Sequence, residues 1–190
     1  MTRKLTVLDL CICASCVALH VILELFCAIR IGNDIKITFA ALPIVIAAFL
    51  CGPLEGFLTG LVGTFLSQLL TFGITATTVF WIIPPSVQGL LCGLTFIAFK
   101  RKLKVVPVGA SVFISGLASA VLTWGASYLD GVVFFKYITT EALCILIPWR
   151  LLVWVGISAV YTLVSLPVIK ALWRKSPAAY KMAAGKKRID

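Results

Sequence analysis

Ionisable and amide side chains that interrupt long apolar segments are the residues of this sequence most able to do chemistry. Arg150, Glu24, Gln68 and Gln88 each stand in such a segment. If the segments cross a membrane, each charge near the centre costs roughly 2.5–3.5 kcal/mol on insertion scales, so it needs a reason to be there. An arginine can hold a carboxylate, and a glutamine amide can pair with a heterocycle edge through one donor and one acceptor. These residue types predict a ligand-binding site.

Aromatic residues and a second cation extend this predicted site. Trp81, Tyr128 and Trp149 occupy the same part of their segments as the polar residues, and aromatic faces stack on flat ring systems. Lys36 could hold a carboxylate in place of Arg150. Two other interpretations stay open, because the aromatic residues could form an interfacial belt and Glu24 could form a structural ion pair with Arg150.

The sequence gives little support for a catalytic site or a metal site. His20 is the only histidine, and although Glu24 follows it at helical spacing, one imidazole makes a poor metal site. Cys13 and Cys16 lie within an apolar helix, where thiols act as small packing residues. No phosphate-binding glycine loop and no Ser/His/Asp arrangement is present. We therefore expect no catalytic residue, no metal and no cofactor in this chain.

The composition indicates the protein class. Of 190 residues, 61% are hydrophobic and 13% are charged, too apolar for a soluble domain that must keep a polar surface. The net charge of +10 gathers at the ends of apolar segments without interleaved aromatic residues, which argues against nucleic-acid binding. The chain is predicted to be a polytopic membrane protein in contact with the lipid bilayer.

Six helical segments must position the candidate site. The run from Ile37 to Thr71 is too long for one crossing and is interrupted by a Gly-Pro turn at 52–53. The predicted helices are Leu5–Ile29, 37–51, 54–71, Val79–Phe99, Val105–Leu129 and Glu141–Ile169. The expected fold is an all-α membrane protein, a six-transmembrane-helix bundle over residues 1–175, followed by a basic cytoplasmic tail at 176–190.

The distribution of Lys and Arg predicts the orientation. With the N-terminus inside, the cytoplasmic segments hold thirteen of these residues and the external segments three, so both termini are expected in the cytoplasm of a plasma-membrane protein. Polar and aromatic residues then concentrate in the external half of the bundle. That arrangement predicts a pocket open to the outside.

Small residues form two stripes at helical spacing. Gly56, Gly60 and Gly63 allow another backbone to approach closely in lipid, and we expect them to pack within the chain. Ala14 and Ala18 form a second stripe, whose packing partner could lie in this chain or in another subunit.

Several short motifs resemble one known family. Lys-Ile-Thr-Phe-Ala-Ala-Leu-Pro-Ile at 36–44, Cys-Gly-Pro-Leu-Glu-Gly at 51–56 and Phe-Trp-Ile-Ile-Pro-Pro at 80–85 are similar to the substrate-binding S-components of energy-coupling factor (ECF) vitamin transporters. So is the segment from Gln88 to Leu94. The resemblance extends from residue 5 to about residue 170, and the segment at 36–43 is most like the folate-type branch.

The resemblance implies that the chain captures a small planar water-soluble vitamin or related heterocycle from outside. It would associate with a membrane coupling subunit and two cytoplasmic ATPases, which would use the ATP. Ala14 and Ala18 match the small-residue pair that faces the coupling subunit in that family. The ligand could be folate-like, deazapurine-like or another vitamin.

Two other classes compete with this interpretation. A stand-alone transporter or channel would more often show inverted repeats, and we find none. An integral membrane enzyme would need a catalytic cluster, which a single histidine does not supply. We therefore expect the chain not to be an enzyme.

Overall fold

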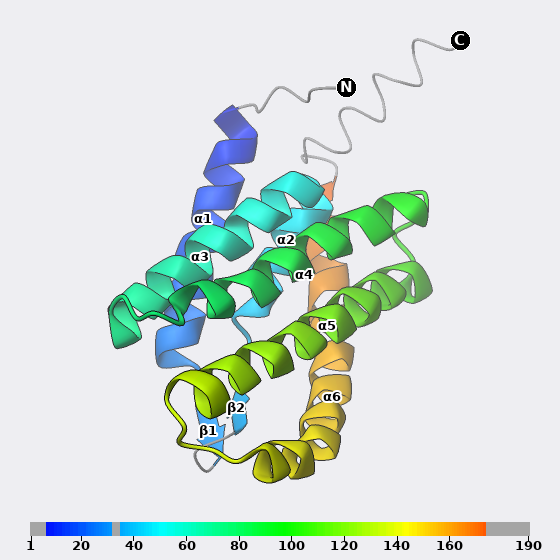
Figure 1. Ribbon diagram of the computed structural model, residues 1–190. Helices are drawn as coiled ribbons and strands as arrows, with labels where there is room; N and C mark the ends of the chain where they lie inside the picture. Colours follow the sequence, from blue (N-terminus) through cyan, green and yellow to red (C-terminus); the bar gives the residue numbers. More distant parts are fainter. Residues whose placement is uncertain (1–6, 32–34, 174–190) are drawn as a thin grey trace, which may run out of the picture.

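Six α-helices make up the computed structural model, which describes residues 7–31 and 35–173 and gives only the backbone for 29–31 and 35–37 (Figure 1). The predicted all-helical bundle is confirmed, and a short antiparallel hairpin joins its first two helices. The elements are α1 (Val7–Phe26), β1 (Ile29–Ile31), β2 (Ile35–Ile37), α2 (Ala41–Leu50), α3 (Pro53–Phe72), α4 (Thr78–Ala98), α5 (Val105–Tyr128), the π-helical turn η1 (Leu129–Phe134) and α6 (Thr140–Trp173). The predicted tail at 176–190 lies outside the described residues.

The turn predicted at Gly52-Pro53 separates α2 from α3. Gly52 has φ 136°, a conformation that favours glycine, and Pro53 opens α3, where its missing N–H costs no helical hydrogen bond. Gly73, with φ 72°, ends the same helix. Local backbone chemistry thus sets both ends of α3.

Helix α2 is shorter than predicted. Its 10 residues span about 15 Å, roughly half of a hydrocarbon core. Every residue from Pro43 to Leu50 is buried, so α2 lies inside the bundle. Within the described residues, four helices are long and apolar enough to cross a membrane: Val7–Phe26, Thr78–Ala98, Val105–Phe134 and Thr140–Trp173. Helix α3 is as long, but its Gly, Thr and Ser residues make it less apolar.

The glycine stripe packs within the chain, as predicted. A Cβ atom added to Gly56 would lie 2.6 Å from Ala48 Cβ, and one added to Gly60 would lie 2.6 Å from the Pro85 carbonyl oxygen. A Cβ on Gly63 would lie 2.8 Å from His20 Cδ2. Because these glycines have no side chain, α3 approaches α1, α2 and α4 closely.

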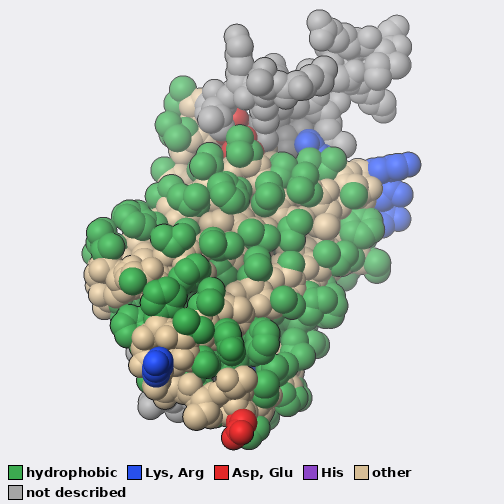
Figure 2. Space-filling view, in the orientation of Figure 1, with side chains coloured by type: hydrophobic (Ala, Val, Ile, Leu, Met, Phe, Trp, Pro, Cys, Tyr) green, Lys and Arg blue, Asp and Glu red, His purple; other side chains and the backbone are tan. Residues whose placement is uncertain are grey.

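The two ends of the bundle differ. The start of α1 and the end of α6 lie at the same end, at the top of Figure 1, and the β1–β2 hairpin lies at the opposite end with the α5–α6 connection. On the face seen in Figure 2, hydrophobic side chains cover most of the described surface, and the largest group of Lys and Arg side chains lies toward the upper end. This arrangement is expected of a bundle surrounded by lipid.

Candidate functional site

A cavity of about 900 Å³ lies mainly between α5 and α6. Most residues of α6 that line it recur every three or four positions, and so do most of those of α5, because one face of each helix turns toward the cavity. The α6 residues on that face are Leu143, Ile147, Arg150, Trp154, Ile157 and Tyr161, and those of α5 are Gly116, Ser119, Ala120, Thr123, Trp124 and Ser127. Helix α4 adds Trp81 and Gln88.

The cavity forms where α5 and α6 diverge. A Cβ on Gly109 would touch Thr162 at 3.3 Å, and a Cβ on Gly116 would lie 2.7 Å from Trp154 Nε1. The Trp154 ring also packs on Phe113, with centroids 4.6 Å apart. Side chains of both helices line the cavity, from Leu143 to Trp154 on α6 and from Gly116 to Ser127 on α5, and Ile157 and Tyr161 extend the lining past Trp154.

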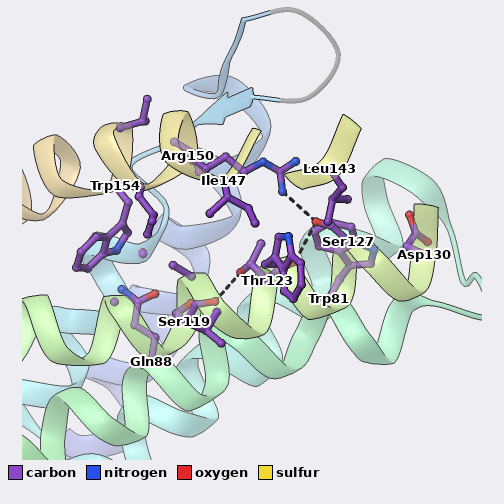
Figure 3. A pocket seen from close by; sticks show the side chains of 18 of the residues that line it. Trp81, Gln88, Ser119, Thr123, Ser127, Asp130, Leu143, Ile147, Arg150 and Trp154 are labelled. Atoms are coloured by element: carbon purple, nitrogen blue, oxygen red, sulfur yellow. Dashed lines mark hydrogen bonds between the residues drawn. The ribbon is translucent and has the colours of Figure 1, made fainter. Parts of the chain in front are cut away.

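A hydrogen-bonded ladder on α5 orients Arg150 (Figure 3). Arg150 donates from Nη1 to Ser127 Oγ at 3.2 Å. Ser127 Oγ donates to the Thr123 carbonyl at 2.9 Å, and Thr123 Oγ1 donates to the Ser119 carbonyl at 2.8 Å. Each hydroxyl hydrogen is bonded along its own helix, so the Ser127 oxygen accepts from Arg150. The guanidinium is thereby held across the gap between α6 and α5.

Thr38 organises the opposite end of the cavity. Its Oγ1 donates to Glu24 Oε2 at 3.0 Å and accepts from the Ala40 amide at 3.1 Å. The Thr38 carbonyl accepts from the Tyr161 hydroxyl at 2.8 Å. One residue therefore ties α1 and α6 to the segment before α2, and it fixes the Glu24 carboxylate at the cavity wall.

The α5–α6 connection covers part of the cavity. Tyr137 donates from its hydroxyl to Asp130 Oδ2 at 2.9 Å, and the Ile138 amide donates to the Gly131 carbonyl at 3.2 Å. Phe135, Tyr137 and Ile138 line the cavity from this connection. The connection is thus folded back on η1.

Five residues of the predicted site meet in this one cavity: Glu24, Gln68, Trp81, Gln88 and Arg150. For Lys36 the structure describes only the backbone, in β2 opposite Arg30. Tyr128 and Trp149 do not line the cavity. Trp149 is 51% exposed. The physical reason is helix rotation, since each stands next to a lining residue and points about 100° away from it.

Sequence reasoning missed other lining residues. Thr38, Ser127, Trp154 and Tyr161 were not singled out, although all four make hydrogen bonds or ring contacts that shape the site. Counting in steps of three and four from Arg150 along α6 reaches both Trp154 and Tyr161. The helical period of α6 could therefore have identified these residues, whereas their depth in the membrane could not.

The predicted docking pair lies on the outer face of α1. Ala14 and Ala18 are exposed, whereas Cys16 and His20 face the bundle and are buried. His20 Nδ1 lies 2.6 Å from the Ala40 carbonyl oxygen. One face of α1 therefore packs on the bundle, and the other, with both alanines, is open.

Comparisons with known proteins identify a family and a fold. The family model "ECF transporter, substrate-specific component" matches residues 8–165. The fold is similar to that of ThiT from Listeria monocytogenes, with a TM-score of 0.61 and 20% identity over 91% of this chain and 97% of that one. It is also similar to the S component of a bacterial ECF transporter, with a TM-score of 0.63 and 18% identity over 86% of this chain and 96% of that one. The search of curated proteins gave no significant match.

Proposed function

The chain belongs to the family of ECF transporter substrate-specific components, and from this premise we propose that it captures a small planar water-soluble vitamin or related heterocycle from outside the cell. Members of this family are substrate-binding subunits of transporters and not enzymes. Membership also implies association with an ECF module of coupling and ATPase subunits. The general role is thus given by the family, and the ligand is what we propose.

The observation that carries the proposal is the cavity of about 900 Å³ between α5 and α6. Cavities of roughly 300–1,000 Å³ that combine apolar walls with a few placed polar groups are typical of small-molecule sites. Here three tryptophans, two glutamine amides, two carboxylates and one guanidinium line the same space, as Trp81, Trp124, Trp154, Gln68, Gln88, Glu24, Asp130 and Arg150.

Each group has a role in binding a flat polar ring. Trp81 offers a face for stacking, and Gln68 and Gln88 offer amides that both donate and accept. Arg150 suits an acidic or carbonyl group of the ligand, and Lys36 is a second candidate for that role. Glu24 suits an N–H group.

The open face of α1 supports the proposed docking role. Ala14 and Ala18 are one turn apart and exposed, and such small residues allow a partner helix to approach closely. We expect them to contact the coupling subunit, while two cytoplasmic ATPases bind the ATP and this chain binds none. The excess of Lys and Arg at one end of the bundle favours cytoplasmic termini.

Mass spectrometry of small molecules released from the purified protein tests the proposal. We expect a heterocyclic compound to co-purify, or a panel of water-soluble vitamins to contain one that raises the melting temperature. An empty protein that no vitamin stabilises would contradict the capture role.

Uptake measurements test the coupling. In cells that express the chain with an ECF module, we expect accumulation of the identified ligand to require intact ATPase subunits. Accumulation by the chain alone would favour a stand-alone transporter.

A further inference from the structure

Three apolar residues of α5 and α6 line the cavity and are also exposed on the outer surface of the bundle. They are Val121, Trp124 and Leu151, whose exposed fractions are 61%, 37% and 40%. A side chain that borders a cavity and the outer surface at the same time lies at an opening. The cavity therefore has an opening between α5 and α6.

The opening faces away from the packed side of α5. The buried residues Ser115, Ser119 and Ala126 lie together on one side of that helix. Val121 stands about 120–160° around the helix from each of them, at 3.6 residues per turn. The opening thus points toward the surroundings of the bundle and not toward another helix that packs on α5.

The opening also lies at the depth of the hydrocarbon core. Val121 is seven residues, about 10 Å, before the end of α5, and Leu151 is eleven residues, about 16 Å, after the start of α6. Both helices are long and apolar enough to cross a membrane, whose hydrocarbon core is about 30 Å thick. Leu152, the exposed neighbour of Leu151, continues the same apolar surface. Lipid chains therefore surround the opening.

The width of the opening favours an acyl chain over a helix of another protein. Helices α5 and α6 are in contact at Gly116 and Trp154, where an added Cβ would lie 2.7 Å from the indole nitrogen. Along the helices, Val121 is only about 7.5 Å from Gly116 and Leu151 only about 4.5 Å from Trp154. A helix with its side chains is about 10–12 Å wide, whereas an acyl chain is a single line of methylene groups.

The cavity wall beside the opening suits an apolar guest. Ala120 and Ile147 line it, and Figure 3 shows Ile147 on the side of α6 that faces α5. The polar residues Glu24, Gln68 and Gln88 come from α1, α3 and α4, and not from the two helices that border the opening. Unfilled space beside apolar groups loses dispersion contacts, which a methylene chain restores without burying a polar group.

We propose that an acyl chain of a membrane lipid enters the cavity between Val121 and Leu151 when no other molecule fills it. The chain lies against Trp124, Ala120 and Ile147, and it leaves when a ligand occupies the same space. This inference goes beyond the proposed function, because it requires a cavity that is open to lipid but no particular vitamin. It gives the cavity a route of access from the bilayer, separate from the end that holds the α5–α6 connection.

Photolabelling by a lipid tests the proposal. The full chain, dialysed to remove bound small molecules, is placed in phosphatidylcholine nanodiscs that contain a phosphatidylcholine with a diazirine near the middle of one acyl chain. After irradiation, fragment mass spectra locate the labelled residues. We expect label on Ile147 and Ala120 in the cavity and on Leu163, which is exposed on α6, but none on Phe49 in the core.

Substitutions at the opening identify the route of entry. Leu151→Trp and Val121→Trp each place a large ring there, so the label on Ile147 should be lost while that on Leu163 stays unchanged. Val121→Ala widens the opening and should increase the label on Ile147. Leu152→Trp is the matched control, because Leu152 is exposed beside Leu151 but does not line the cavity, and it should leave the label on Ile147 unchanged.

Two results would overturn the proposal. Absence of label from Ile147 and Ala120 in the unsubstituted protein would mean that no chain reaches the cavity. Label on Ile147 that persists in both Trp variants would mean that the chain enters elsewhere. In either case a vitamin that stabilises the protein would still support the capture role, and label on Ile147 in a protein that binds no vitamin would support the opening while the proposed function fails.

Discussion

The helices α1 to α4 form a packed half of the molecule, whereas α5, η1 and α6 form a cavity half, and residue volume at the helix contacts accounts for the difference. In the packed half, glycines face each other, and a Cβ on Gly89 would overlap the Gly56 carbonyl. In the cavity half, Trp154 fills the contact between α5 and α6. Small residues bring backbones together, and one large ring between helices is followed by an open space.

The packed half holds most of the hydrophobic core, and the cavity half holds most of the residues that line the cavity. The buried apolar residues of the core lie mostly in α2 and in the helices around it, including Phe49 and Phe96, whose rings are 4.6 Å apart. Most cavity-lining residues come from α5, α6 and their connection. The packed half contributes single groups at its edge, such as Gln88 and Glu24. The closely packed half thus contributes part of a site whose remaining wall is formed by α5, η1 and α6.

The largest effect is expected on the outer face of the packed half. Ala18→Trp should abolish energised uptake because a bulky ring prevents close approach of the coupling subunit, while ligand affinity stays unchanged. Uptake assays and calorimetric titration measure the two effects. Ala159→Trp is the control, since Ala159 is an exposed alanine on α6. Loss of binding in Ala18→Trp would mean that this face packs within the bundle.

Within the packed half, the glycine contacts should dominate stability. Gly56→Ala is expected to cost about 2–3 kcal/mol, because its Cβ would lie 2.6 Å from Ala48 Cβ and 2.8 Å from the Gly89 carbonyl oxygen. Thermal unfolding in detergent measures this loss. The matched control is Gly156→Ala in the cavity half, where nothing lies within 4 Å of the added atom. Equal melting temperatures for both variants would show that the helices of the packed half are not packed more closely than those of the cavity half.

The packed half was the easier one to predict from the sequence. Gly52-Pro53 predicted the break between α2 and α3, and the glycine spacing predicted the close packing, since both follow from local backbone chemistry. The hairpin and the short α2 were not predicted. An apolar segment indicates that its residues contact lipid or the protein core. It does not indicate whether the segment forms a helix long enough to cross the membrane.

The lining of the cavity was predicted in part. Depth identified Arg150 and Trp81 correctly as residues of one region, and five predicted residues do line the cavity. The same reasoning from depth also predicted Trp149, which points away from the cavity. Neighbouring residues of a helix lie at similar depth but point in different directions. Thr38 was missed, since its role depends on bonds to α1 and α6 that no local pattern encodes.

Substitutions of cavity-lining residues should change ligand affinity more than they change the melting temperature, including substitutions at the edge of the packed half. Trp81→Ala is expected to weaken binding by about 1–3 kcal/mol, because it removes a ring from the cavity wall. Trp149→Ala, which removes the same side chain from an exposed position, should leave affinity unchanged. Calorimetric titration of both variants with the identified ligand compares them. Equal losses would show that the predicted wall is not the binding surface.

The smallest effect is expected where the two halves are joined. Tyr161→Phe removes only the hydroxyl that donates to the Thr38 carbonyl at 2.8 Å, and a single hydrogen bond is worth about 0.5–1.5 kcal/mol net. We expect the melting temperature of the empty protein to fall by a few degrees and ligand affinity to fall less than in Trp81→Ala.

Tyr128→Phe is the matched control for this tether. Among the residues that the structure describes, the Tyr128 hydroxyl has no hydrogen-bond partner, so its removal should change neither quantity. If Tyr161→Phe instead lowers affinity and leaves the empty protein as stable as before, the hydroxyl bonds to the ligand when it is present. Thr38 would then stabilise the empty protein through its bond to Glu24 of α1 and not through its bond to α6.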